Sequence, residues 1–170
     1  QTQIYVGQIG THMTDPNFFP LYVGNHAFGG PSFQARMIKQ IRVERGWSYV
    51  AYSYFRHGTQ PRLWTFTFFP AAKYTPTALA YSLEMVRKLR KKGITEEEFQ
   101  FAKNSLINNA GFRYDTPNKR VENVLLEKTL DLPAGFMRSF GERISSVKRE
   151  QVNQALKEFL KPESFLITVL

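Results

Sequence analysis

Residues 47–56, WSYVAYSYFR, and residues 63–69, LWTFTFF, are the stretch of sequence that decides the fold. Both runs are rich in aromatic and β-branched side chains, which favour β-strands. Residues 58–61, GTQP, stand between them and carry the glycine and proline of a turn. We therefore predict a β-hairpin with Phe66 and Phe68 on one face of its second strand, because side chains alternate across a strand.

The rest of the chain is predicted to be helical, apart from one strand near each end. Residues 3–10 alternate apolar and polar side chains, and residues 165–170 form an apolar run after Pro162, so both are predicted strands. Helices are predicted where apolar residues recur every three or four positions, or where capping signals occur, as at residues 95–98. These helices cover residues 16–28, 32–45, 79–92, 96–110, 117–132 and 151–160. Helices that cover a largely antiparallel sheet form an α+β domain, which is the fold class that we predict.

The composition indicates one folded domain, residues 1–170, that is part of a longer chain. A length of 170 residues with 42% hydrophobic residues supports a core and excludes global disorder. The first residue is Gln1 rather than methionine, so we interpret the sequence as a piece of a longer protein. No signal peptide is visible, which leaves the bacterial periplasm and the cytoplasm both open. The longest apolar runs, such as residues 63–70, are too short to cross a membrane, so we predict no membrane partner.

The residues needed for metal or covalent catalysis are scarce. The chain has no cysteine, and its histidines, His12, His26 and His57, are 14 and 31 residues apart. This spacing matches none of the patterns H-x-x-E-H, H-x-x-x-H or H-E-x-x-H, so we predict no metal site in this chain. Gly29 and Gly30 lack the Gly-Lys-Ser/Thr that follows in a phosphate-binding loop, and we predict no bound cofactor.

The net charge of +9 permits several kinds of acidic partner. The densest basic cluster, RKLRKK at residues 87–92, ends a predicted helix, where cations interact favourably with the helix dipole. We interpret the cluster as a solvated helix end and predict no nucleic-acid partner. A basic nucleic-acid-binding module stays an alternative function, and a salt-dependent gel shift tests it.

Several segments form an ordered set of motifs. Residues 25–37, NHAFGGPSFQARM, lead into residues 41–49, IRVERGWSY. Residues 93–99, GITEEEF, come before Ala102-Lys103, and a predicted helix and strand follow within residues 147–169. This set resembles the pitrilysin/insulinase family of zinc metallopeptidases. It is similar to the C-terminal-type domain of that family, which lacks the inverted zinc motif.

The resemblance implies a fold and a function. The expected fold has a largely antiparallel sheet covered by helices, as in domains of the pitrilysin and mitochondrial-processing-peptidase type. The expected function is to form one wall of a peptide chamber, with a peptide as the substrate. Zinc is expected on a partner of the same family, which is another domain of the same polypeptide or a second subunit in a homo- or heterodimer. Without H-x-x-E-H, this chain alone is not expected to hydrolyse peptides.

The resemblance also implies an auxiliary catalytic pair, Arg42 and Tyr49. A guanidinium and a phenol are both hydrogen-bond donors, suited to a peptide carbonyl whose oxygen becomes negative during hydrolysis. Arg42 belongs to the last turn of a predicted helix, Gly46 lets the chain reverse, and Tyr49 comes early in the next strand, so the two side chains can converge. Two alternatives stay open. In one, Arg42 is a surface cation and Tyr49 a half-buried strand aromatic. In the other, the chain is an inactive assembly subunit, such as the core subunits that the family contributes to respiratory complexes.

Overall fold

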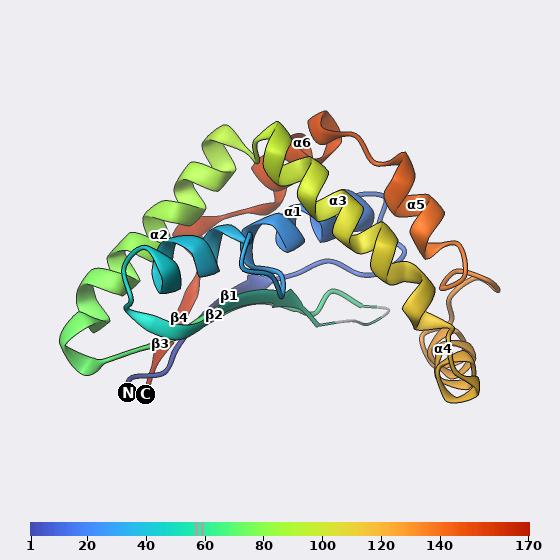
Figure 1. The fold of residues 1–170 in the computed structure, drawn as a ribbon, viewed down its shortest axis with the longest axis horizontal. Helices are drawn as coiled ribbons and strands as arrows, with labels where there is room; N and C mark the ends of the chain where they lie inside the picture. Colours follow the sequence, from blue (N-terminus) through green and yellow to red (C-terminus); the bar gives the residue numbers. More distant parts are fainter. Residues whose placement is uncertain (57, 59) are drawn as a thin grey trace.

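The computed structural model describes residues 1–56, 58 and 60–170, and Figure 1 shows its architecture. Helices lie on one side of a four-stranded antiparallel sheet, so the predicted α+β class is confirmed. The strands are β1 (Ile4–Ile9), β2 (Ser48–Phe55), β3 (Leu63–Pro70) and β4 (Leu166–Val169), in the order β2-β3-β1-β4. The helices are α1 (Phe18–Gly29), the π-helical segment η1 (Ile38–Val43), α2 (Thr75–Lys92), α3 (Glu96–Ala110), α4 (Pro117–Thr129), α5 (Phe140–Ser146) and α6 (Arg149–Phe159).

The hairpin of β2 and β3 anchors the core, and its two strands are confirmed. Phe66 and Phe68 of β3 lie opposite aliphatic residues of β1, and both rings are fully buried beneath the helices. Burial of one such ring contributes about 2–3 kcal/mol relative to leaving it in water. Within the predicted turn, Thr59 lies outside the described residues, as does the neighbouring His57.

Helix α1 begins two residues later than its capping signal predicts. The carbonyl of Asp15 accepts a hydrogen bond from the Phe18 amide, and its carboxylate accepts one from the Asn17 amide at 2.7 Å. These bonds form a turn ahead of the helix, so Phe18 rather than Pro16 is the first helical residue. An aspartate that binds the amide two residues further on stabilises a turn of this kind.

The helix predicted over residues 32–45 is confirmed only in part, because the helical residues begin at Arg36 and most of them form a π-helix. Ile38–Val43 form η1, in which the Glu44 amide bonds to the carbonyl five residues earlier. Such a segment is usually a single wide turn, and it is frequent at functional sites. The sequence pattern does not reveal it, because the buried residues Met37 and Ile41 are four positions apart and suit either kind of helix.

For helix α4, the sequence correctly predicts a helix but not which of its residues are buried. The predicted apolar positions of α4, Val121, Val124 and Leu125, are 54–59% exposed. Helix α4 projects beyond the sheet in Figure 1, and none of its residues is buried by the described chain. Helix α5 is absent from the predicted elements, because its seven residues are too few to show a clear period.

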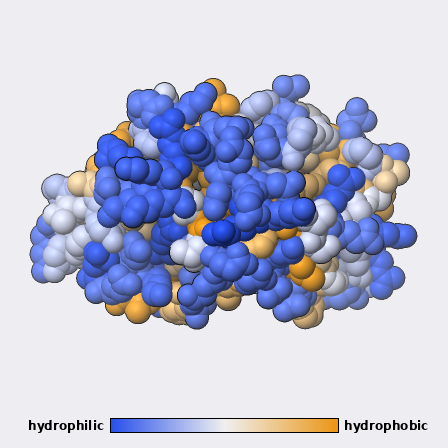
Figure 2. Space-filling model, turned by 90° about the horizontal axis from the view of Figure 1, so that it is seen from above, coloured by the Kyte–Doolittle hydropathy of each residue, from blue (hydrophilic) through white to orange (hydrophobic). Residues whose placement is uncertain are grey.

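The outward faces of the helices are mostly hydrophilic, as Figure 2 shows from the helix side of the molecule. The basic cluster at residues 87–92 belongs to this surface, since all its residues except the buried Leu89 are exposed at the end of α2. Among the described residues, no helix combines the length and the apolar character that crossing a membrane requires.

The opposite face of the sheet, which we call the outer sheet face, is formed by Tyr5, Ile9, Tyr54, Leu63 and Leu166. These side chains line a shallow hollow of about 400 Å³. Leu166 and Ile9 are more than 70% exposed, because in the described part of the chain the helices gather on the other face.

Candidate functional site

Arg42 and Tyr49 are brought together by the short segment that joins η1 to β2. Arg42 lies in the last turn of η1, and its carbonyl accepts a hydrogen bond from the Gly46 amide at 3.0 Å. Gly46 has a φ of +62°, a left-handed conformation that favours glycine, so the chain can reverse there and enter β2. Tyr49 is the second residue of β2, which is an edge strand of the sheet.

The Arg42 guanidinium lies over the faces of two exposed aromatic rings. Its central carbon is 3.9 Å from the ring centroid of Tyr49 and 4.8 Å from that of Phe33, both within cation–π range. Tyr49 is 73% exposed and Phe33 is 65% exposed. We call these three residues the Arg42 cluster. Among the described residues, the Arg42 side chain has no ion-pair or hydrogen-bond partner, so its N–H groups are available to a ligand.

The observed geometry differs from the expected one in two respects. The face of the Tyr49 ring contacts the Arg42 guanidinium, whereas the sequence predicts a role only for the phenol hydroxyl, as a donor. Phe33 was not predicted as a site residue at all. Its sequence signal is a large apolar residue directly after GGPS at residues 29–32, a run of small residues and a proline that marks a break between helices. The catalytic role of Arg42 and Tyr49 stays a prediction.

Arg45, three residues after Arg42, has several partners in its own chain. Its Nη1 atom donates to the Gln40 carbonyl at 2.9 Å and to the Glu44 carboxylate at 3.1 Å. Its guanidinium also lies 3.9 Å from the ring centroid of Tyr81. Arg45 therefore holds η1 against α2, whereas the Arg42 guanidinium contacts only the rings of Phe33 and Tyr49 among the described residues.

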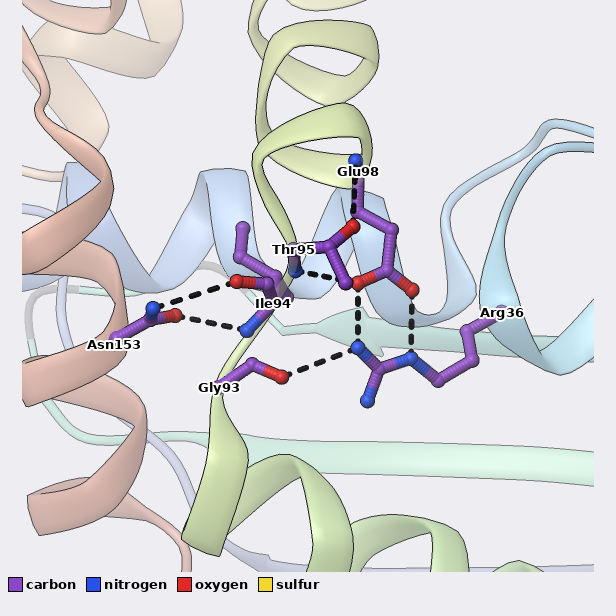
Figure 3. Close-up of polar contacts among 6 residues, drawn as sticks. All are labelled: Arg36, Gly93, Ile94, Thr95, Glu98 and Asn153. Carbon is purple, nitrogen blue, oxygen red and sulfur yellow. Dashed lines mark hydrogen bonds and ion pairs between the residues drawn. The ribbon is translucent and has the colours of Figure 1, made fainter.

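A second polar cluster fixes the start of η1 against α3, as Figure 3 shows. The Nε and Nη2 atoms of Arg36 donate to the two carboxylate oxygens of Glu98 at 2.7 and 2.5 Å, and Nη2 also donates to the Gly93 carbonyl at 3.1 Å. Glu98 accepts a further bond from the Thr95 amide at 2.8 Å, which completes the predicted capping box. Asn153 of α6 accepts a hydrogen bond from the amide just before Thr95 at 2.8 Å, so three elements meet here.

The Arg36–Glu98 ion pair is structural. Burial by itself would raise the pKa of the Glu98 carboxyl, but the hydrogen bonds and charge of Arg36, together with the bonds from Thr95, hold this pKa below its usual range. The two side chains are only 14% and 21% exposed. A cleft of about 450 Å³ opens beside them, with Lys39, Glu97 and Phe101 among its lining residues. Because each charge is satisfied by the other, the pair supports the cleft wall rather than offering a free charge to a ligand.

His26 is buried between α1 and α3 and does not form a metal site. Its Nε2 atom is 3.1 Å from the Ser105 hydroxyl, and its ring stacks on that of Phe101 at a centroid distance of 6.5 Å. Across residues 1–56, 58 and 60–170, no three His, Asp or Glu side chains are grouped so that they could hold a metal ion. A hydroxyl and an aromatic ring do not replace the missing nitrogen and carboxylate ligands, so the residues around His26 do not fit zinc.

His26 is expected to make the folded domain less stable in mildly acidic solution. Burial lowers its pKa below the ordinary value of 6.5, so the unfolded chain binds more protons between these two values. The free energy of unfolding should therefore fall as the pH drops from 6.5 toward the folded pKa. Denaturant titrations over this range should show a shallower fall in His26→Gln than in the wild type. His12→Gln, in the N-terminal loop, is the control, and equal slopes in all three proteins would contradict the expectation.

Comparison with known proteins gives the family. The family profile described as "Peptidase M16 inactive domain" matches residues 1–106. The "Non-peptidase homolog YmxG" of Helicobacter pylori is 27% identical over 135 residues, which are 75% of this chain and 30% of that protein. The fold is similar to that of a peptidase M16 inactive domain from Pseudomonas fluorescens, with a TM-score of 0.90 and 23% identity over 99% of this chain and 40% of that chain. It is also similar to a chain of complex III2 from Candida albicans, with a TM-score of 0.82 and 18% identity over 99% of this chain and 42% of that one.

The matching profile confirms the resemblance that the motifs at residues 25–49 suggested. The matched range, residues 1–106, includes all three residues of the Arg42 cluster and both residues of the Arg36–Glu98 pair. The present chain spans about 30% of the length of the curated relative that it matches. The chain belongs to the family of peptidase M16 inactive domains.

Proposed function

We propose that this domain forms one wall of a peptide chamber opposite a zinc-bearing domain or subunit of the same family, and that Arg42 and Tyr49 bind the scissile carbonyl. The observation that supports the proposal is that the Arg42 guanidinium is held by a ring but has no ion-pair partner among the described residues. The guanidinium carbon lies 3.9 Å from the centroid of the Tyr49 ring. An unpaired arginine held in place beside an exposed phenol is suited to a ligand that brings negative charge.

The proposed role is electrostatic. The carbonyl oxygen of a peptide gains negative charge in the transition state of hydrolysis, and donors that are already in position stabilise this charge without further reorganisation. Arg42 supplies planar N–H donors, and Tyr49 supplies a hydroxyl. Loss of one such donor typically costs about 3 kcal/mol of transition-state stabilisation.

The proposed partner agrees with two features of the chain. The outer sheet face leaves Leu166 and Ile9 more than 70% exposed, and a neighbouring domain would remove this apolar surface from water. The chain also spans only 30–42% of the H. pylori, P. fluorescens and C. albicans chains that it matches. We therefore propose that residues 1–170 are one domain of a larger assembly, which supplies the metal, since the described residues contain no cluster of metal ligands.

Arg42→Ala is expected to lower the turnover of the assembled enzyme about 100-fold while leaving the fold intact, because the lost donor acts on the transition state. The full-length protein is assayed for peptide cleavage together with its zinc-bearing domain or subunit. The free energy of unfolding should change by about 1 kcal/mol or less, which is the contribution of an exposed cation–π contact. Arg87→Ala on the exposed face of α2 is the matched control. If the wild type is active and Arg42→Ala has the same turnover, the proposal is contradicted.

A second candidate is an assembly subunit without catalytic duty. The H. pylori relative is described as a non-peptidase homolog, and a chain of C. albicans complex III2 shares the fold. In this case the full-length protein should bind its partner with equal affinity in wild type and Arg42→Ala, and the complex should cleave no peptide of a broad panel. Cleavage that depends on Arg42 excludes this candidate.

A further inference from the structure

Phe33 is an exposed phenylalanine in the loop between α1 and η1. Its ring contacts the Arg42 guanidinium, which also contacts the ring of Tyr49. Single exposed apolar side chains are ordinary on protein surfaces. Two exposed rings that meet at one unpaired cation are different, because binding sites combine apolar walls with a few oriented polar groups. We propose that Phe33 is the third member of the substrate site. It positions Arg42 and contacts an apolar side chain of the peptide next to the bound carbonyl. This inference rests on the proposed function of Arg42.

The positioning role follows from what restrains Arg42. A long arginine side chain has many rotamers, and those of Arg42 are not limited by an ion pair or hydrogen bond to the described residues. The ring faces of Phe33 and Tyr49, at 4.8 and 3.9 Å, are the contacts that hold its guanidinium. A cation–π contact at an exposed site corresponds to about a two- to fivefold preference for the held position.

The contact role follows from the free area of the ring and from the spacing. Phe33 is 65% exposed even with Arg42 against it, so most of its ring can still pack on a ligand. The guanidinium carbon lies 4.8 Å from the Phe33 centroid. An extended peptide advances by about 3.3 Å per residue. A peptide whose carbonyl meets Arg42 therefore brings the side chain of an adjacent residue within reach of Phe33, and an apolar side chain there is favoured because it buries the ring.

The contact role is tested by binding to the full-length protein assembled with its partner, after a chelator has removed the catalytic metal so that the probes are not cleaved. The probes are dye-labelled ten-residue peptides that differ only at one central position, which is Phe, Leu, Ala or Asp, and anisotropy gives their dissociation constants. The wild type is expected to bind the Phe and Leu peptides about tenfold more tightly than the Ala peptide, the gain from burying part of one large apolar side chain. Phe33→Ala should remove this preference, whereas Phe33→Tyr should keep it. Phe112→Ala is the matched control, since Phe112 is 63% exposed in another part of the chain.

The positioning role is tested by the Nε–Hε resonance of Arg42, assigned by its loss in Arg42→Lys. Phe33→Leu keeps apolar area but lacks a ring face, so it should shift this resonance, while Phe33→Tyr and Phe112→Ala should not. An unshifted resonance in Phe33→Leu overturns the positioning role. A preference that persists in Phe33→Ala, or a wild type without any preference, overturns the contact role. If Arg42→Ala leaves turnover unchanged while Phe33→Ala abolishes the preference, the proposed function fails and the contact role of Phe33 stands.

Discussion

Glu98→Gln is expected to lower the free energy of unfolding by about 3 kcal/mol. The substitution keeps the shape of the side chain but removes the charge that Arg36 meets through two hydrogen bonds, at 2.7 and 2.5 Å. Arg36 would then hold an uncompensated charge with a side chain that is only 14% exposed. Removing one partner of a buried ion pair usually costs several kcal/mol for this reason. The capping bond to the Thr95 amide would also weaken, because an amide oxygen is a poorer acceptor than a carboxylate.

Denaturant unfolding of Glu98→Gln beside Glu97→Gln measures this effect. Glu97 is the exposed neighbour in the same helical turn, so its substitution removes the same charge from the α3 dipole without touching Arg36. The pH adds a second test. The pKa of the Glu98 carboxyl is lowered in the folded state, so its contribution is complete above the unfolded value of 4.5 and is lost as the pH falls through the folded pKa. The difference between wild type and Glu98→Gln should shrink in that acidic range, and a difference that does not depend on pH would contradict the ion-pair account.

Gly29→Ala is expected to destabilise the domain by about 2–3 kcal/mol, although alanine is the better helix former. A Cβ atom at Gly29 would lie 2.6 Å from the backbone nitrogen of Ser53 and 2.9 Å from its Cβ. These atoms belong to β2, which cannot yield without disturbing its ladder with β3. Helix α1 would have to move away from the sheet, and with it the loop that carries Phe33.

Gly24→Ala in the same helix is the matched control for Gly29→Ala. A Cβ atom at Gly24 would meet only the side chain of Leu156, at 3.0–3.1 Å, and a leucine side chain can shift. The gain in helix propensity, about 1 kcal/mol, should offset that adjustment. Thermal or denaturant unfolding should therefore separate the two variants clearly. Equal stabilities would show that α1 and β2 are not packed as closely as the structure indicates.

The strands and most helices were predictable because their signals are local. Aromatic alternation marks β2 and β3, and the box Thr95 to Glu98 marks the start of α3. The predictions fail where a local sequence signal is compatible with two different backbone structures. Asp15 supports a turn instead of capping α1, and the spacing of Met37 and Ile41 does not distinguish an α-helix from η1.

The candidate site was predicted only in part. Arg42 and Tyr49 were named because the motif around them resembles a known family, and the reversal at Gly46 made their approach plausible. Phe33 was not named, because its contact with Arg42 depends on how the loop after α1 folds back over η1. The same limit applies to α4, whose helical pattern is evident although the described chain does not bury it.

The sequence by itself determined the fold class and the order of the strands and of most helices, because caps, turns and residue periods act over a few neighbouring positions. Its ordered motifs also indicated the family. The tertiary structure decided which side chains meet over larger separations. It placed Arg36 on Glu98, 62 residues away, and brought Phe33 and Tyr49 to the same guanidinium. These meetings depend on the packing of whole helices against the sheet, and the spacing of residues along the chain does not specify that packing. For this reason Arg36 and Arg45 hold elements of the fold together, while the Arg42 side chain has no ion-pair or hydrogen-bond partner among the described residues.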